Sequence, residues 1–236
     1  MTVLRLADDG EAADLAAFLS RLLHYDRAAA VRLQAAPAGG AGDGGVLAVF
    51  GRPPSFEVLA IRTARLAEPV RLDATVSAGE LLDGIEEPAG ELAVPAAVTG
   101  PPWAGVLPPQ GGWRRVPGLP EPDALGRVLA ASVAEFRARD GELPPERRTR
   151  TERDRIGREI WSRAVGDTHL PLRAVHAAQS LGFLRPVRAP VGATGAGSLP
   201  EPYTLLAAGG WLRFRTPHGS IAVRTGGLQG LSVTPA

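Results

Sequence analysis

Arginine is the residue type through which this chain is best equipped to do chemistry, because all 26 of its basic residues are arginine. A guanidinium group stays charged and forms paired hydrogen bonds with carboxylates and phosphates, so it binds anions and does not act as a base or nucleophile. Lysine and cysteine do not occur in the sequence. Their absence excludes Schiff-base lysines, phosphate-loop lysines, thiol nucleophiles, disulfides and cysteine-ligated zinc.

The histidines and serines do not form a catalytic or metal-binding pattern. His169 and His176 are seven residues apart with Pro171 between them, which matches neither His-x₃-His nor His-Glu-x-x-His. The Gly-Ser pairs at 197–198 and 219–220 lack the second glycine of a nucleophile elbow. We therefore predict no catalytic residues, no metal site and no cofactor.

Charge is unevenly distributed along the chain. Residues 1–120 hold 10 arginines and 14 acidic residues, whereas residues 121–236 hold 16 arginines and 11 acidic residues. Seven arginines and three acidic residues lie within residues 147–163, a density that could contact a phosphate backbone. The alternative is internal neutralisation, because Asp154 and Arg158 are spaced as an i,i+4 ion pair.

The order of elements in the second half resembles a winged helix-turn-helix, with three predicted helices followed by a hairpin. On the third helix, polar residues share one arc that could reach base edges. On the hairpin, arginines share one face, as a DNA-contacting wing would require. The candidate nucleic-acid-binding residues are Arg147, Arg148, Arg150, Arg153, Arg173, His176, Gln179, Arg213, Arg215 and Arg224.

Tryptophans supply a different candidate site. Trp103 and Trp113 lie in a segment rich in proline and glycine, and Trp211 opens a predicted strand. Tryptophans are unusual in a solvated linker, so we expect partly buried rings on a domain surface. An exposed apolar patch around these three residues would be a surface for a protein partner or for self-association.

The elements that position these residues fall into two halves. Within residues 1–99, Asp8 or Asp9 predicts the start of an amphipathic helix, and Ser77 with Glu80 forms a capping box for a short second helix. Apolar runs and alternations predict strands at 1–6, 31–35, 46–50, 56–62 and 70–76. We predict a mostly antiparallel sheet with one or two helices against it.

Proline and glycine supply 12 of the 23 residues from 100 to 122, which predicts a linker lying on the surface. Residues 123–236 then form the second predicted domain. Its expected elements are a helix ending at Asp140-Gly141, a helix capped by Thr151, a helix from Pro171 to Gly182, and a hairpin turning at 216–220. The predicted fold class is α+β, with a winged-helix-like unit in the second half.

These features favour a soluble cytoplasmic protein from a G+C-rich bacterial genome, since Met1–Asp14 does not resemble a signal peptide. The long uncharged run at 92–113 contains too many prolines and glycines to cross a membrane as a helix. The favoured function is a non-enzymatic interaction or regulatory module with a protein partner or as a homo-oligomer. DNA binding through the second half is the alternative, and a small-ligand-binding protein or enzyme is the third possibility.

Overall fold

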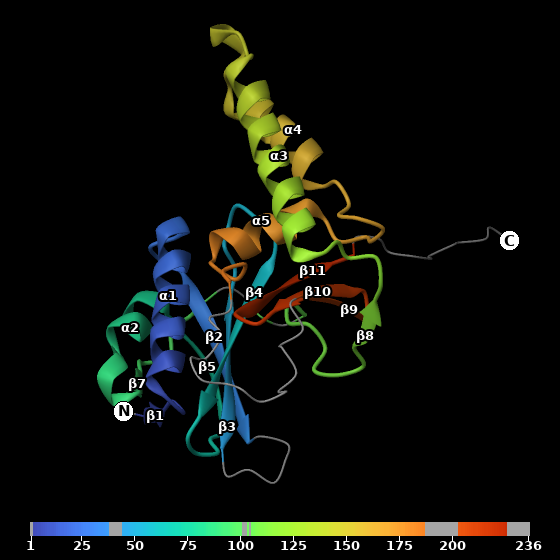
Figure 1. Ribbon diagram of the computed structural model, residues 1–236. Helices are drawn as coiled ribbons and strands as arrows, with labels where there is room; N and C mark the ends of the chain where they lie inside the picture. The colour runs from blue at the N-terminus through green and yellow to red at the C-terminus, as the bar shows by residue number, and fades with distance from the viewer. Residues whose placement is uncertain (1, 38–43, 101–102, 104, 187–202, 226–236) are drawn as a thin grey trace, which may run out of the picture.

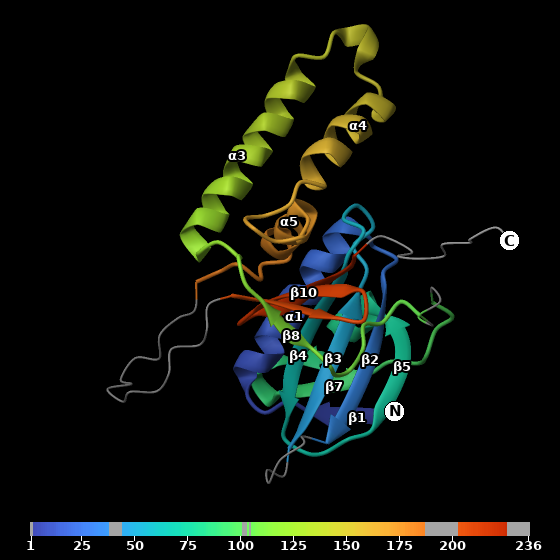
Figure 2. The same cartoon turned by 90° about the vertical axis from the view of Figure 1, so that its right-hand side faces the viewer.

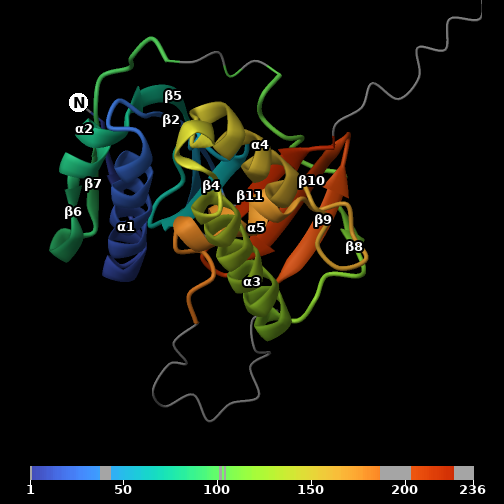
Figure 3. The same ribbon diagram turned by 90° about the horizontal axis from the view of Figure 1, so that it is seen from above.

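A single antiparallel sheet forms the centre of the molecule. The computed structural model describes residues 2–37, 44–100, 103, 105–186 and 203–225. Among these residues, eight strands form a sheet in the order β5-β2-β3-β4-β11-β10-β9-β8. Helices cover one face of this sheet, and the connection that leads to β8 crosses the other face (Figures 1 and 3). The predicted α+β class is confirmed.

Most strands follow the predicted apolar patterns, but β6, β7 and β8 were not predicted, and β8 lies within the predicted linker, where it pairs with β9. In the large sheet they are β2 (Ala30–Pro37), β3 (Gly45–Gly51), β4 (Leu59–Leu66), β5 (Leu72–Ser77), β8 (Arg114–Val116), β9 (Thr204–Ala208), β10 (Trp211–Thr216) and β11 (Gly219–Arg224). A smaller sheet of the order β1-β7-β6 contains β1 (Thr2–Arg5), β7 (Glu91–Val94) and β6 (Ile85–Glu86). Strand β4 begins later than predicted because Phe56 closes a turn, donating its N–H to the Pro53 carbonyl at 3.3 Å.

Side-chain caps fix the starts of three helices. Asp8 accepts a hydrogen bond from the Glu11 N–H at 2.9 Å, and Ser77 caps its helix as predicted. The second helix of the C-terminal half is capped by Thr149 and not by Thr151, because Thr149 is the residue with extended backbone before the first turn. The helices are α1 (Asp9–Tyr25), α2 (Ala78–Asp83), α3 (Pro122–Gly141), α4 (Arg150–Trp161) and α5 (Leu172–Ser180), with 3₁₀ turns η1 (Glu87–Ala89) and η2 (Pro145–Arg147).

The predicted C-terminal hairpin is β10–β11, and it lies inside the large sheet. Strand β10 pairs with β9 on its outer side, and β11 pairs with β4 of the first half. Three residue pairs make this second junction, including Ile221 with Ala60. The winged-helix-like detail is not confirmed, because both hairpin strands are flanked by other strands and do not extend from the body as a wing.

Helices α3 and α4 form an antiparallel hairpin that projects away from the sheet (Figure 2). Arg139 pairs with Glu159 at 2.7 Å, and Arg163 pairs with Glu135 at 2.7 Å. These guanidinium groups hold the pKa of both carboxyls below their usual range, mainly through the hydrogen bonds. Helix α5 lies at the base of the hairpin, where it packs against β11.

The large core lies between the sheet and the helices and draws on both halves of the chain. Phe18 of α1 stacks on Phe183 with ring centroids 5.6 Å apart, and Phe214 of β10 is fully buried in the same cluster. Burial of apolar surface on this scale is the main stabilising term in a protein of this size. Within the described segments, no helix is long and apolar enough to cross a membrane.

Candidate functional site

The sheet face opposite the helices carries a second, smaller apolar cluster that contains two tryptophans. Trp103 and Trp211 are each 8% exposed there. Their buried neighbours come from β3, β4 and β11 and are Phe50, Leu59, Ile61 and Ala222. Trp113 packs against the cluster from its edge. The structure therefore brings together all three tryptophans that the sequence indicated, but it buries two of them, so the expected exposed apolar patch around all three is not formed and Trp113 alone of the three stays partly exposed.

Two arginines lie over tryptophan rings on this face. The Arg224 guanidinium carbon is 5.0 Å from the centroid of the Trp211 ring, and that of Arg213 is 5.8 Å from the Trp113 ring. The Trp113 indole N–H donates to the Pro109 carbonyl at 3.0 Å, which fixes the ring. Each arginine makes a cation–π contact with its ring, which leaves its N–H groups able to donate hydrogen bonds.

Arg213 is a cation in a partly buried position, and no carboxylate of the described residues pairs with it. Its Nε donates to the Ser220 hydroxyl at 3.0 Å. Burial, and then the charge of Arg215 two residues along β10, lower the pKa of Arg213 below its usual value. In the part of the chain that the structure describes, no ion pair is formed by Arg213, Arg215 or Arg224.

We call this set the tryptophan–arginine face. Its members are Trp103, Trp113, Trp211, Arg213, Arg215 and Arg224. Two separately predicted groups, the interaction tryptophans and the hairpin arginines, thus form one surface. It can present positive charge over an apolar base, which suits an anionic partner.

The four arginines predicted near residue 150 lie elsewhere, around the connection between α3 and α4 that forms the far end of the hairpin (Figure 2). Arg153 pairs with Asp140 at 2.6 Å, and Arg148 donates to the carbonyls of Leu143 and Gly141. The other two are paired more loosely, Arg147 with Glu152 at 3.6 Å and Arg150 with Asp154 at 3.7 Å. These guanidinium groups are partly neutralised locally and are not gathered with those of the hairpin strands.

The predicted polar arc of α5 is also apart from the tryptophan–arginine face. His176 stacks on Trp161 at 4.3 Å between centroids and meets the edge of Phe56 at 5.2 Å. Burial lowers the pKa of His176. Arg173 is partly buried, and Gln179 alone of the three is fully exposed. This arrangement places His176 in an aromatic cluster and not on an open recognition surface.

Two family models match the chain, and they meet in the proline- and glycine-rich segment. Residues 1–105 match a domain of unknown function, DUF8010. Residues 108–228, more than half of the chain, match a second domain of unknown function, DUF8185. The chain belongs to the DUF8185 family. The comparison with curated proteins and the comparison with solved structures gave no match.

The tryptophan–arginine face draws on both matched segments. The DUF8185 segment supplies Trp113, Trp211 and the three arginines, while Trp103 and part of the apolar base come from the segment that matches DUF8010. The face is therefore complete only when the DUF8185 strands are paired with β4. The sequence alone does not place the two groups together, because no local pattern in it indicates the pairing of β4 with β11.

A second polar cluster, which the sequence did not indicate, joins the DUF8185 segment to α1. Buried Arg62 donates to Asp14 at 3.0 Å, and Arg185 also pairs with Asp14 and donates to the His218 ring at 3.2 Å. The cavity beside this cluster is only about 10 Å³, too small for a substrate. Among the described residues, no group of three or more histidine and acidic side chains could hold a metal ion. The cluster therefore connects the two halves and has no room for a reactant.

Proposed function

We propose that this protein is a non-enzymatic interaction module that binds an acidic segment of a protein partner at the tryptophan–arginine face. The observation that carries the proposal is the group Arg213, Arg215 and Arg224, which share one face of a sheet without an ion pair in the described chain. Arg213 is the partly buried member of this group and the other two are exposed; a partly desolvated cation destabilises a fold, so it is commonly retained for an external anion.

The apolar base beneath these charges supports a protein partner. Interface cores are enriched in tryptophan and arginine, which supply contact area and charge. Trp113 remains partly exposed beside Arg213, and Leu107, also of intermediate burial, packs against the same apolar cluster. An acidic segment with apolar side chains would complement both the positive charge of the arginines and the apolar cluster beneath them.

A nucleic acid is a weaker match for the same surface. Binding along a phosphate backbone needs many unpaired cations in a row, and the formal net charge of the whole chain is only +1. Arg153 and Arg148 at the end of the hairpin are engaged by their own neighbours. These charges favour a short contact with an acidic peptide over extended contact with DNA.

Fluorescence anisotropy with a labelled Glu/Leu peptide tests the proposal, with single-stranded and duplex DNA of equal charge as comparison probes. The double variant Arg213→Gln/Arg224→Gln is expected to weaken peptide binding at least about tenfold, because the loss of even one charge-assisted hydrogen bond has an effect of this size. The matched control is Arg150→Gln/Arg158→Gln, which removes two exposed charges from α4 and should retain binding. An equal loss of peptide affinity in the two double variants, or tighter binding of either DNA than of the peptide, would contradict the proposal.

A further inference from the structure

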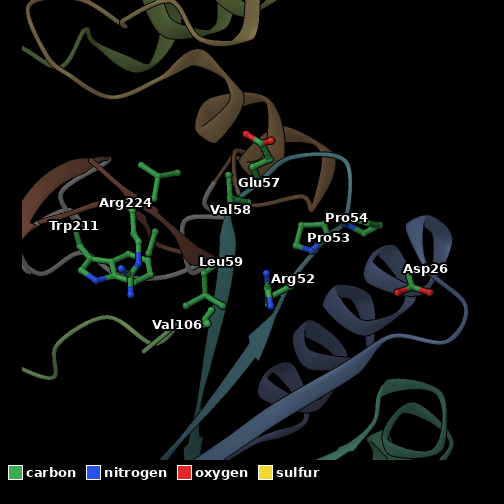
Figure 4. Close-up of a pocket in the computed structure, with 12 residues that line it drawn as sticks. Asp26, Arg52, Pro53, Pro54, Glu57, Val58, Leu59, Val106, Trp211 and Arg224 are labelled. Carbon is green, nitrogen blue, oxygen red and sulfur yellow. The ribbon is translucent and has the colours of Figure 1, made fainter. Parts of the chain in front are cut away.

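A pocket of about 570 Å³ lies beside the tryptophan–arginine face, between two segments that are far apart in the sequence (Figure 4). One wall is the turn from Arg52 to Leu59, and the other is made by Trp211 and residues 222–224, with Val106 below. This volume is within the range of small-molecule sites, which are concave and mostly apolar with a few polar groups.

The interior of the pocket is apolar and fixed. Val58 is 7% exposed, Leu59 2% and Val223 1%, so these side chains are already packed into the fold without a ligand. Trp211 adds the edge of a large ring. A ligand that fits here needs a compact apolar body.

Two guanidinium groups supply positive charge at the opening. Figure 4 shows Arg52 between Leu59 and Pro53, and Arg224 beside Trp211 on the other side. Within the described residues, neither arginine forms an ion pair. Because a guanidinium binds a carboxylate through two parallel hydrogen bonds, this pair of arginines selects an anionic head group.

The acidic residues of the rim lie away from the two arginines and limit the charge of the ligand. Asp26 lies at the end of α1 and accepts a hydrogen bond from the Ala28 N–H at 3.0 Å (Figure 4). Glu57 stands at the upper rim of the pocket, above Val58. A nearby carboxylate disfavours a second negative charge on a ligand, so a monoanion fits better than a dianion.

The backbone of this wall is held in a costly conformation. Glu57 has φ = 52°, and it is the only non-glycine residue with positive φ in the described chain. Pro53 and Pro54 restrict the preceding backbone. Strained residues are retained where the surrounding structure preorganises a site.

We propose that this pocket binds a small monocarboxylate with a flat apolar body, its carboxylate between Arg52 and Arg224 and its body against Trp211 and Leu59. This site overlaps the proposed partner surface, because the two share Arg224 and Trp211. Arg52 belongs only to the pocket and Arg213 only to the tryptophan–arginine face. The two proposals can therefore be tested separately.

Isothermal titration calorimetry of the full chain with 2-naphthoate and its neutral analogue 2-naphthamide provides the test. Naphthoate is expected to bind at least about tenfold more tightly than naphthamide. Arg52→Gln should remove this preference for naphthoate. Arg213→Gln should preserve the preference but weaken binding of the acidic peptide. Absence of naphthoate binding up to about 5 mM, equal binding of both probes, or an unchanged preference in Arg52→Gln would overturn the assignment.

Discussion

Arg62 on β4 donates a hydrogen bond of 2.8 Å to the backbone carbonyl of His218, in the turn between β10 and β11. The same guanidinium reaches Asp14 at 3.0 Å and Glu11 at 3.4 Å. Arg62 therefore ties α1, β4 and the C-terminal hairpin to one point. Its side chain is 8% exposed, so this contact is shielded from solvent to a degree that surface ion pairs are not.

Replacing Arg62 by Met should lower the free energy of unfolding by about 3 kcal/mol, because it removes the shielded cation that Asp14 and Glu11 share and the hydrogen bond to the His218 carbonyl. Urea unfolding followed by circular dichroism measures the change. Arg65 pairs with the same Glu11 but is 67% exposed, so Arg65→Met should cost less than about 1 kcal/mol. A similar loss of stability in the two variants would show that the burial of Arg62 does not strengthen its ion pairs.

Replacing Arg213 by Gln should leave the free energy of unfolding unchanged or raise it by up to about 1 kcal/mol, since it removes a partly buried cation that pairs with no carboxylate in the described part of the chain. Arg32 is a suitable comparison on the same sheet, because it pairs with Asp73 at 2.7 Å. Arg32→Gln should destabilise by about 1 kcal/mol. Thermal and urea unfolding of both variants measure these changes in stability. A strong destabilisation by Arg213→Gln would assign that residue a structural role.

Glu57→Gly should raise the free energy of unfolding by about 1 kcal/mol, because glycine adopts positive φ without steric cost. The neighbouring exposed Ser55 has no positive φ, so Ser55→Gly should destabilise slightly through the entropy of the unfolded chain. Chemical unfolding of the pair distinguishes relief of strain from a general effect of glycine. A loss of stability in Glu57→Gly would mean that its side chain stabilises the turn.

The pKa of His176 predicts a pH dependence with a definite sign. Burial lowers this pKa from the ordinary value of 6.5, so as the pH falls through 6.5 the unfolded chain binds a proton that the folded chain does not. The free energy of unfolding should therefore decrease with falling pH until the lowered pKa is reached. In His176→Phe, the free energy of unfolding should fall less between pH 7.5 and 5.5 than in the unmodified protein. In His169→Gln, which changes an exposed residue, it should fall by the same amount as in the unmodified protein. An unchanged slope in His176→Phe would refute this account.

Local signals in the sequence predicted much of the fold. Asp8 and Ser77 predicted the helix starts, and the hairpin turn near His218 followed from its composition. The pairing of β4 with β11 could not be predicted in this way, because Ile61 and Ser220 are distant in the chain and no local residue pattern links them.

The candidate site was only partly predictable for the same reason. Trp211, Arg213 and Arg215 are two residues apart along β10 and therefore share a face of the sheet. The same spacing predicted the common face of the two arginines, and it also includes the tryptophan. The pairing of Arg153 with Asp140 depends on the bend between α3 and α4. Nothing in the sequence indicated the positive φ of Glu57, since glutamate rarely adopts it.

The junction of β4 with β11 also has a consequence during synthesis on the ribosome. The outer edge of β4 stays unsatisfied until its partner strand emerges, long after Ala60 has been made. An uncovered strand edge is a template for association between nascent chains. The same open edge would allow two separately produced fragments, cut in the segment between Trp103 and Trp113, to complement each other into one sheet.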